Sequence, residues 1–346
     1  MKIKRIPIFI LIMMTLSFSY VQAEPTTRIV GGNEAEEDAY PFMAALVYKG
    51  SKPFNGQFCG GTLIQSEWVV TAAHCVTDNR GYPESEDSMD VILGIHNLKS
   101  DISYNRYSVS KIIVNPSYND FTVDSDIALL KLSQPADSKY TPISLVSEGS
   151  DYVGQMATVM GWGALVEDGS FPDDYPDALM EISIPVVSNE TCSESIWGIT
   201  NNMICAGYQK GELDACSGDS GGPLVIYENG EWKLLGIVSF GEGCARPDYY
   251  GVYTRVANFN SFVEDYIGTR TTEADYQKGY DAAVEVCKAN PAACGIDVYS
   301  YVASGPLPDG RWVVIFPDPQ TVTDDNFWDK IDESINTYNQ WNNARN

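Results

Sequence analysis

Ser220 lies in the segment Asp-Ala-Cys-Ser-Gly-Asp-Ser-Gly-Gly-Pro, residues 214–223. A serine between an aspartate and a Gly-Gly pair can occupy a tight turn that exposes its hydroxyl and brings backbone N–H groups together. Acyl transfer needs such a nucleophile beside an oxyanion hole, the set of donors that stabilises the negative oxygen of the intermediate. A serine in a glycine-rich turn is more often only a turn residue, so the rest of the sequence must supply a base.

His74 is the candidate base, because a serine hydroxyl is a weak nucleophile near neutral pH without one. It lies in Thr-Ala-Ala-His-Cys at 71–75, whereas the second histidine, His96, has no chemically active neighbours in the sequence. A carboxylate that accepts the other imidazole N–H would fix the tautomer. Asp126, at the start of Asp-Ile-Ala-Leu-Leu, is favoured over Asp124 for that role.

These segments, together with Arg-Ile-Val-Gly-Gly at 28–32, resemble the trypsin/chymotrypsin family of serine proteases from Ile29 to about Gly268. The resemblance implies that Ser220 is the nucleophile, that His74 acts as general base and then acid, and that Asp126 orients the imidazole. It also implies peptide hydrolysis through an acyl-enzyme.

The resemblance extends to the oxyanion hole and to activation. It implies that the backbone N–H groups of Gly218 and Ser220 form the hole. It also implies that cleavage after Arg28 frees the ammonium group of Ile29, which then pairs with Asp219. Since Arg28 suits the expected specificity, either the enzyme itself or another tryptic protease could carry out this step.

Asp214 resembles the aspartate at the base of trypsin's primary specificity pocket, where a carboxylate captures Arg or Lys. Gly241 and Gly251 match the open pocket walls, and Ser239 belongs to the substrate-binding set. Ala215 stands where trypsin has a serine whose hydroxyl helps to solvate a bound ammonium. We therefore expect a preference for Arg over Lys.

The chain has eight cysteines, which in an exported protein favour disulfides over metal sites. The resemblance implies three pairs, Cys59 with Cys75, Cys192 with Cys205, and Cys216 with Cys244. The remaining two, Cys287 and Cys294, are expected to pair with each other. No metal and no cofactor are expected, and trypsin's acidic calcium ligands are replaced by Ile95 and Asn105.

Short apolar runs separated by Gly, Pro, Asn and Asp indicate an all-β protein of packed antiparallel barrels. Two six-stranded barrels are what the resemblance implies. A short closing helix is expected at 259–266. Residues beyond 268 are expected to form a small α+β appendage, with helices at 274–288 and 325–338 and a strand at 311–316.

The ends of the chain suggest four parts. Residues 1–23 have the basic start, apolar core and small-residue cleavage site of a signal peptide. We expect a propeptide at 24–28, the protease domain at 29–268 and an extension of unknown role at 269–346. The protein is therefore expected to be secreted and extracellular, or periplasmic in transit if bacterial, without a membrane span.

The formal net charge is −25, and removal of the three basic residues of the signal makes it −28. Such acidity argues against nucleic acid as a partner and favours cationic protein or peptide substrates. Two other interpretations remain. One is a binding protein on an inactive protease fold, which is disfavoured because Ser, His and Asp are all present. The other is a protease whose role is set by an attachment, export or partner-binding function of residues 270–346.

Overall fold

The computed structural model describes residues 31–78, 80–150 and 152–267, together with the backbone of 303–306 and 312–315. The chain forms two compact units, with the division between Ile267 and Gly268. The expected signal, Arg28 and Ile29 lie outside the described residues, as do the expected helices of the extension and the last two cysteines, Cys287 and Cys294.

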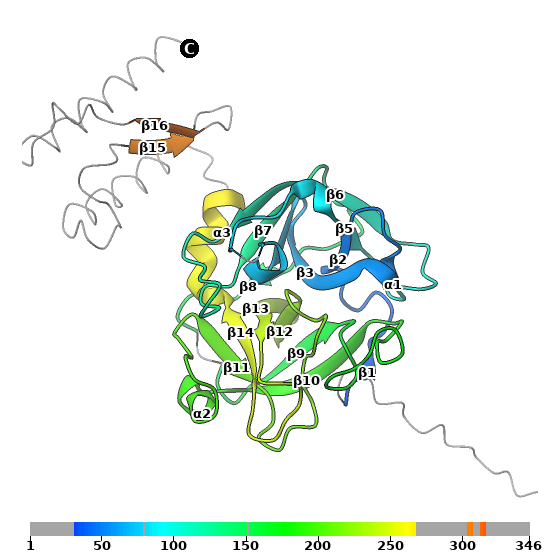
Figure 1. Ribbon diagram of the computed structural model, residues 1–346, viewed down its shortest axis with the longest axis vertical. Coiled ribbons are helices and arrows are strands. Elements are labelled where there is room, and N and C mark those ends of the chain that lie inside the picture. The colour runs from blue at the N-terminus through cyan, green and yellow to red at the C-terminus, as the bar shows by residue number, and fades with distance from the viewer. Residues whose placement is uncertain (1–30, 79, 151, 268–302, 307–311, 316–346) are drawn as a thin grey trace, which may run out of the picture. The chain divides into compact units, whose positions relative to one another are not determined.

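The first unit contains two barrels, which lie one above the other in Figure 1. The first barrel closes in the order β2-β3-β4-β7-β6-β5, and every neighbouring pair is antiparallel. Its strands are β2 (Met43–Tyr48), β3 (Gln57–Gln65), β4 (Trp68–Thr71), β5 (Met89–Leu93), β6 (Asn105–Val114) and β7 (Ala128–Leu132).

The second barrel closes in the order β9-β10-β11-β14-β13-β12, because β9 pairs with both β10 and β12. Its strands are β9 (Met156–Gly161), β10 (Met180–Val187), β11 (Met203–Ala206), β12 (Pro223–Glu228), β13 (Glu231–Phe240) and β14 (Gly251–Arg255). Two short strands extend this sheet: β1 (Asn33–Glu34) pairs with β10, and β8 (Ser144–Leu145) pairs with β13. The expectation of two six-stranded antiparallel barrels is confirmed.

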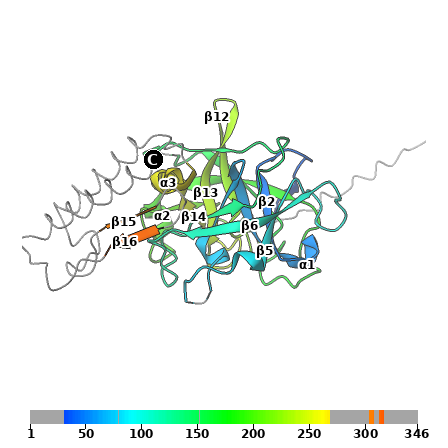
Figure 2. The ribbon, with the colours of Figure 1, turned by 90° about the horizontal axis from the view of Figure 1, so that it is seen from above.

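Local sequence explains these strands. Along β10 every second residue is buried, which is the two-residue period of a strand with one face in the core. The β12–β13 hairpin turns at Asn229 and Gly230, with φ of 54° and 88°. Asn-Gly is the sequence that tolerates two successive positive φ values, so the turn follows directly from it. This hairpin projects from the body of the unit in Figure 2.

Helices are few and short in the described residues. They are α1 (Pro53–Gly56), α2 (Asn189–Ser193) and α3 (Asn260–Ile267), with 3₁₀ turns η1 (Ala73–Cys75), η2 (Glu86–Ser88) and η3 (Val256–Phe259). Helix α3 is the expected closing helix, displaced by one residue from the prediction. None of the helices in the described ranges is long and apolar enough to cross a bilayer.

The second unit is described only in a two-stranded sheet. Strand β16 (Trp312–Ile315) falls within the predicted strand at 311–316. It pairs antiparallel with β15 (Ala303–Pro306), which the sequence analysis did not predict. A Pro and a Gly within β15 obscure its strand character in the sequence.

The structure joins Cys59 to Cys75, Cys192 to Cys205, and Cys216 to Cys244, the pairs that the resemblance implies. Cys59 on β3 is joined to Cys75 in the segment after β4, and Cys205 on β11 is joined to Cys192 in α2. The third connects the Ser220 turn to the segment before β14. The first and the third disulfide therefore brace the segments that carry His74 and Ser220.

Candidate active site

His74 and Asp126 meet because of the register of the first barrel. In the pairing of β4 with β7, Thr71 lies opposite Ala128. The residues that follow β4 and those that precede β7 therefore leave the same end of the barrel. His74 Nδ1 lies 2.7 Å from Asp126 Oδ2, and the His74 backbone N–H donates to Asp126 Oδ1 at 2.9 Å. One carboxylate thus holds both the imidazole ring and the backbone N–H of His74 through two hydrogen bonds.

The Asp126 carboxylate is only 1% exposed, and such burial is costly without hydrogen bonds. The second barrel supplies further bonds. Ser239 Oγ on β13 donates to Asp126 Oδ2 at 2.5 Å, and Thr254 Oγ1 on β14 donates to the Asp126 carbonyl at 2.6 Å. The sequence analysis placed Ser239 with the substrate and missed this contact and Thr254. The triad carboxylate is therefore held by both barrels.

The environment of His74 favours its charged form. Burial lowers the pKa of the imidazole, but the hydrogen bond to Asp126 and the negative charge of that carboxylate outweigh it, so the pKa lies above its usual value. In the neutral form of His74, Nδ1 donates to the carboxylate and Nε2 is left as the acceptor. That is the arrangement a general base needs.

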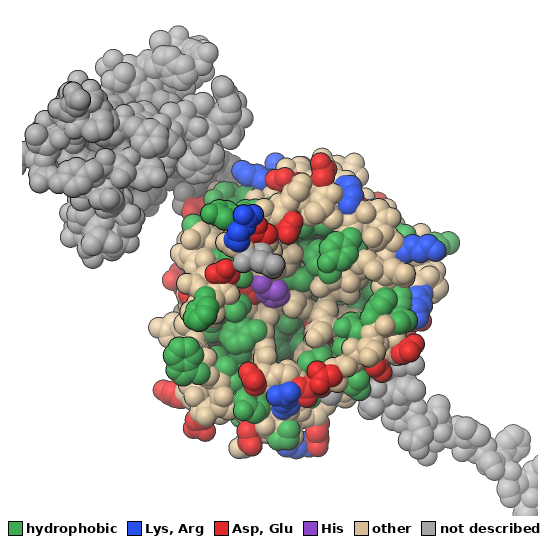
Figure 3. Space-filling model, viewed as in Figure 1, with side chains coloured by type: hydrophobic (Ala, Val, Ile, Leu, Met, Phe, Trp, Pro, Cys, Tyr) green, Lys and Arg blue, Asp and Glu red, His purple; other side chains and the backbone are tan. Residues whose placement is uncertain are grey.

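Ser220 lies in a turn that packs against the segment carrying His74. The Gly60 N–H donates to the Ser220 carbonyl at 2.7 Å, and the Gly221 N–H donates to the Val238 carbonyl at 2.8 Å. A Cβ on Gly221 would lie 2.2 Å from Thr71 Oγ1, three residues before His74. Only glycine allows so close an approach, which explains the residue after the candidate nucleophile. Figure 3 shows a histidine side chain at the surface of the face that is viewed there.

Gly218 has the conformation and surroundings expected beside an oxyanion hole. Its φ is +102°, a region that favours glycine. Gln57 Nε2 donates to the Gly218 carbonyl at 2.8 Å and so fixes its orientation. Within the described residues, the N–H groups of Gly218 and Ser220 donate to no protein acceptor. The sequence analysis missed Gln57, which no motif marks.

The Asp219 carboxylate is buried and hydrogen-bonded to backbone N–H groups. Its oxygens accept from the Gly163 N–H at 2.7 Å and the Cys216 N–H at 2.9 Å. Any Cβ on Gly161 or Gly163 would overlap this carboxylate. Burial raises the pKa of Asp219 to about 6, although the two backbone hydrogen bonds oppose it. No cation pairs with Asp219 in the described part of the chain, which excludes Ile29.

Asp214 is 7% exposed and only partly satisfied. The Ala245 N–H donates to its Oδ2 at 3.0 Å, while Oδ1 is buried without a hydrogen bond from any described residue. Burial raises the pKa of this carboxyl to about 7. A buried oxygen without a donor is uncommon in folded proteins and suggests a missing partner, here a group that a ligand would supply.

Gly251 lies directly against Asp214, and Gly241 also has open space where a side chain would stand. A Cβ on Gly251 would lie 2.9 Å from Asp214 Oδ1, whereas one on Gly241 would meet only the Gly243 carbonyl, at 3.3 Å. The Tyr253 hydroxyl is also buried without a partner in the described residues, 3.0 Å from the same Gly251 position. Tyr253 is a member of this pocket that the sequence analysis missed. Ala215, half-buried, packs against the core of the second barrel.

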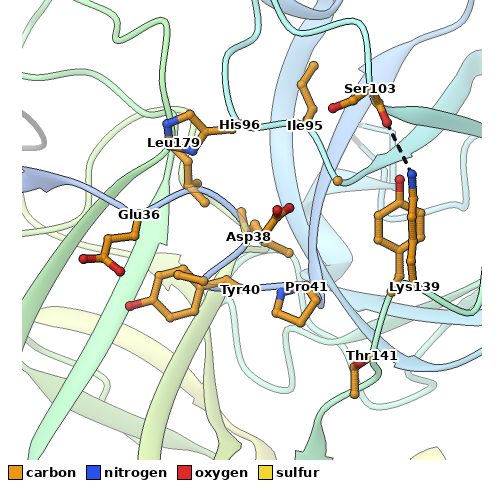
Figure 4. Close-up of a pocket in the computed structure, with 14 residues that line it drawn as sticks. Glu36, Asp38, Tyr40, Pro41, Ile95, His96, Ser103, Lys139, Thr141 and Leu179 are labelled. Carbon is orange, nitrogen blue, oxygen red and sulfur yellow. Dashed lines mark hydrogen bonds between the residues drawn. The ribbon is translucent and has the colours of Figure 1, made fainter.

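His96 is placed elsewhere. Its Nε2 lies 3.1 Å from Glu34 Oε1, and it lines a cavity of about 550 Å³ that contains none of the triad residues. Figure 4 shows His96, Asp38 and Lys139 around this cavity. The preference for His74 over His96 as the partner of Asp126 agrees with this placement.

One cluster of possible metal ligands occurs in the described ranges, formed by Cys59, His74 and Cys75. The two sulfurs are joined in a disulfide, so neither is available as a thiolate. The cluster is thus a consequence of the disulfide next to the candidate base.

Comparison with known proteins agrees with this geometry. Residues 29–263 match the Trypsin family model. The chain is 38% identical to trypsin of Xenopus laevis over 244 residues, which is 69% of this chain and 91% of the relative. It is 38% identical to trypsin-3 of Salmo salar over 239 residues, 68% of this chain and 91% of the relative. With vitamin K-dependent protein C of Mus musculus it shares 36% identity over 268 residues, 74% of this chain and 55% of the relative. The chain belongs to the trypsin family and is a serine endopeptidase, a hydrolase of protein substrates.

Proposed function

We propose that this protein is a secreted endopeptidase, made as an inactive precursor, that hydrolyses peptide bonds after Arg and less well after Lys. The observation that carries the specificity is the buried Asp214 Oδ1, which accepts no hydrogen bond from the residues that the structure describes and faces the space left open by Gly251. A guanidinium group would supply the missing donors with charge-assisted hydrogen bonds.

In the proposed mechanism the Ser220 hydroxyl attacks the carbonyl carbon of the peptide bond while His74 Nε2 accepts its proton. The carbonyl oxygen becomes negative and is stabilised by the N–H groups of Gly218 and Ser220. His74 then donates the proton to the leaving amine, which leaves an ester on Ser220. Water repeats the sequence and releases the acid. Throughout, Asp126 holds the imidazole and stabilises its charged form.

Activation is proposed to act through Asp219. A buried carboxylate is costly unless it is paired, and the raised pKa of Asp219 reflects that cost. Cleavage after Arg28 would create the ammonium group of Ile29, a cation able to pair with it. Because Asp219 lies between Gly218 and Ser220, this pair would order the oxyanion hole.

Arg is proposed to be preferred over Lys because Ala215 offers no hydroxyl beside Asp214. The planar guanidinium can contact Asp214 with two N–H groups. Lysine presents a compact ammonium that relies on additional acceptors, one of which this chain lacks. Asp214, Ala215, Gly241 and Gly251 would together determine this choice.

The proposed organisation is a signal at 1–23, a propeptide at 24–28, the protease at 29–268 and an extension at 269–346. Secretion is supported by the composition of residues 1–23 and by the disulfides, which form in oxidising compartments. The activating enzyme would be another tryptic protease or a second copy of this chain.

A peptide-library profile tests this proposal. Precursor cleaved after Arg28 should cut after Arg and, more slowly, after Lys, and the matched Ser220→Ala protein should cut nothing. An Arg28→Gln precursor should stay inactive under the same treatment. Cleavage mainly after apolar residues, or near-equal rates on matched Arg and Lys peptides, would contradict the specificity assigned to Asp214 and Ala215.

A further inference from the structure

The turn that precedes Asp126 is strained. Val123 has φ of 54° and Ser125 has φ of 58°, both in the left-handed region. Neither residue is glycine, and Val123 is β-branched, which makes that region particularly unfavourable. Each such residue costs on the order of 1–3 kcal/mol and persists only where its surroundings hold it.

The Asp124 carboxylate, between these two residues, is bound by the loop that leads into β11. Thr200 Oγ1 donates to Asp124 Oδ1 at 2.5 Å, and Asn202 Nδ2 donates to Asp124 Oδ2 at 3.1 Å. Ser125 Oγ also donates to Oδ2, at 3.0 Å. Since β11 is a strand of the second barrel, these bonds connect the turn across the boundary between the barrels.

Asp126, which carries the catalytic carboxylate, lies two residues after Asp124. The contacts of Asp126 with Ser239 and Thr254 hold its side chain and its carbonyl, but they do not act on the turn itself. If Val123 and Ser125 relaxed toward negative φ, the Asp126 backbone would rotate and its oxygens would move away from His74.

We propose that Asp124, with Asn202 as its partner, is a positioning residue of this protease: it holds the strained turn that presents Asp126 to His74. This inference rests on the proposed function, because it assigns a role within the same catalytic site. Asp124 touches no reacting atom in it and acts only through Asp126.

A pH profile can detect such a role, because few titratable groups surround His74. Asp126 faces Nδ1, and the sulfur of the Cys75 disulfide lies 3.8 Å from Nε2. Tyr118 also lies near Asp126; burial and the charge of Asp126 raise its pKa to about 12, so it stays neutral in the assay. Asp124 is the remaining carboxylate next to Asp126 along the chain. A displaced Asp126 therefore lowers the pKa of His74 and moves the acid limb of kcat/KM to lower pH.

The experiment exchanges the two partners. Asn202→Asp places a carboxylate against Asp124, Asp124→Asn removes the charge, and the double variant restores one carboxylate and one amide in exchanged positions. Asn201→Asp is the matched control, because it makes the same change of charge on the exposed neighbour. Both kcat and kcat/KM for an arginyl peptide are measured against pH on processed enzyme, with active sites counted by covalent titration.

We expect N202D to lower kcat per active site about 10–100-fold, the loss typical of a small misplacement of a catalytic group, and to move its acid limb to lower pH. The double variant should recover to within a few-fold of the parent, and N201D should change little. An unchanged acid limb with normal kcat per active site in N202D would overturn the proposal, as would failure of the double variant to recover. If N202D does not fold, D124N compared with the double variant provides the same comparison. A parent enzyme without activity would contradict the proposed function instead.

Discussion

The affinity of the specificity pocket for a guanidinium ligand should depend steeply on pH, because Asp214 must be ionised to bind it. The pKa of this carboxyl is about 7 instead of 3.8, as a result of burial. With a pKa of about 7, the ionised fraction falls about 90-fold between pH 8 and pH 5, which corresponds to roughly 3 kcal/mol of binding free energy. A carboxyl with the ordinary pKa would change the affinity by less than about a tenth over that range.

The measurement uses a processed Ser220→Ala, His74→Ala protein, which neither cuts the ligand nor titrates at His74. Isothermal titration calorimetry with N-acetylarginine amide from pH 5 to pH 9 gives both the affinity and the protons released on binding. Asp214→Asn in the same background should bind weakly at every pH. A flat affinity between pH 5 and pH 8, with Asp214 intact, would refute the reasoning that burial without a partner keeps this carboxyl protonated.

Three further predictions concern the same site. Ser220→Ala should lower kcat by about 10⁴-fold or more and abolish labelling by an organophosphonate, with an unchanged melting temperature; residual labelling would point to a different nucleophile. Ala215→Ser should raise the Lys to Arg ratio of kcat/KM on matched peptides by restoring a hydroxyl beside Asp214, and an unaltered ratio would exclude that explanation. In an Arg28→Gln precursor, the raised pKa of Asp219 means that the folded state holds its proton more tightly than the unfolded chain. The free energy of unfolding measured with urea should therefore fall as the pH rises from about 4 to about 6. This pH dependence should be absent from the double variant Arg28→Gln, Asp219→Asn.

Much of this architecture follows from the sequence because its signals are local. The Asn229-Gly230 turn and the alternation along β10 are local signals of this kind, and the three cysteine pairs were implied by the family resemblance. His74 and Asp126 were also identified, because each lies in a short motif. Short apolar runs bounded by turn residues indicated the strands of the barrels.

What the sequence did not reveal are contacts between segments far apart in the chain. Ser239 was expected at the substrate, yet its hydroxyl donates to Asp126, 113 positions away. Gln57 and Tyr253 carry no motif, and their positions beside Gly218 and Asp214 depend on how the two barrels pack. Such partners become visible only when the packing of the two barrels is known, since neither composition nor spacing encodes it.

The hydrogen bonds that β13 and β14 donate to Asp126 have a consequence for the newly made chain. During translation, the segment with His74 and Asp126 is synthesised well before Ser239 and Thr254. In a partly synthesised chain that ends before β13, the Asp126 carboxylate lacks the hydroxyl groups that hold it in place. The arrangement of His74 with a fully bonded Asp126 therefore cannot be completed during translation until the last strands of the second barrel have been made.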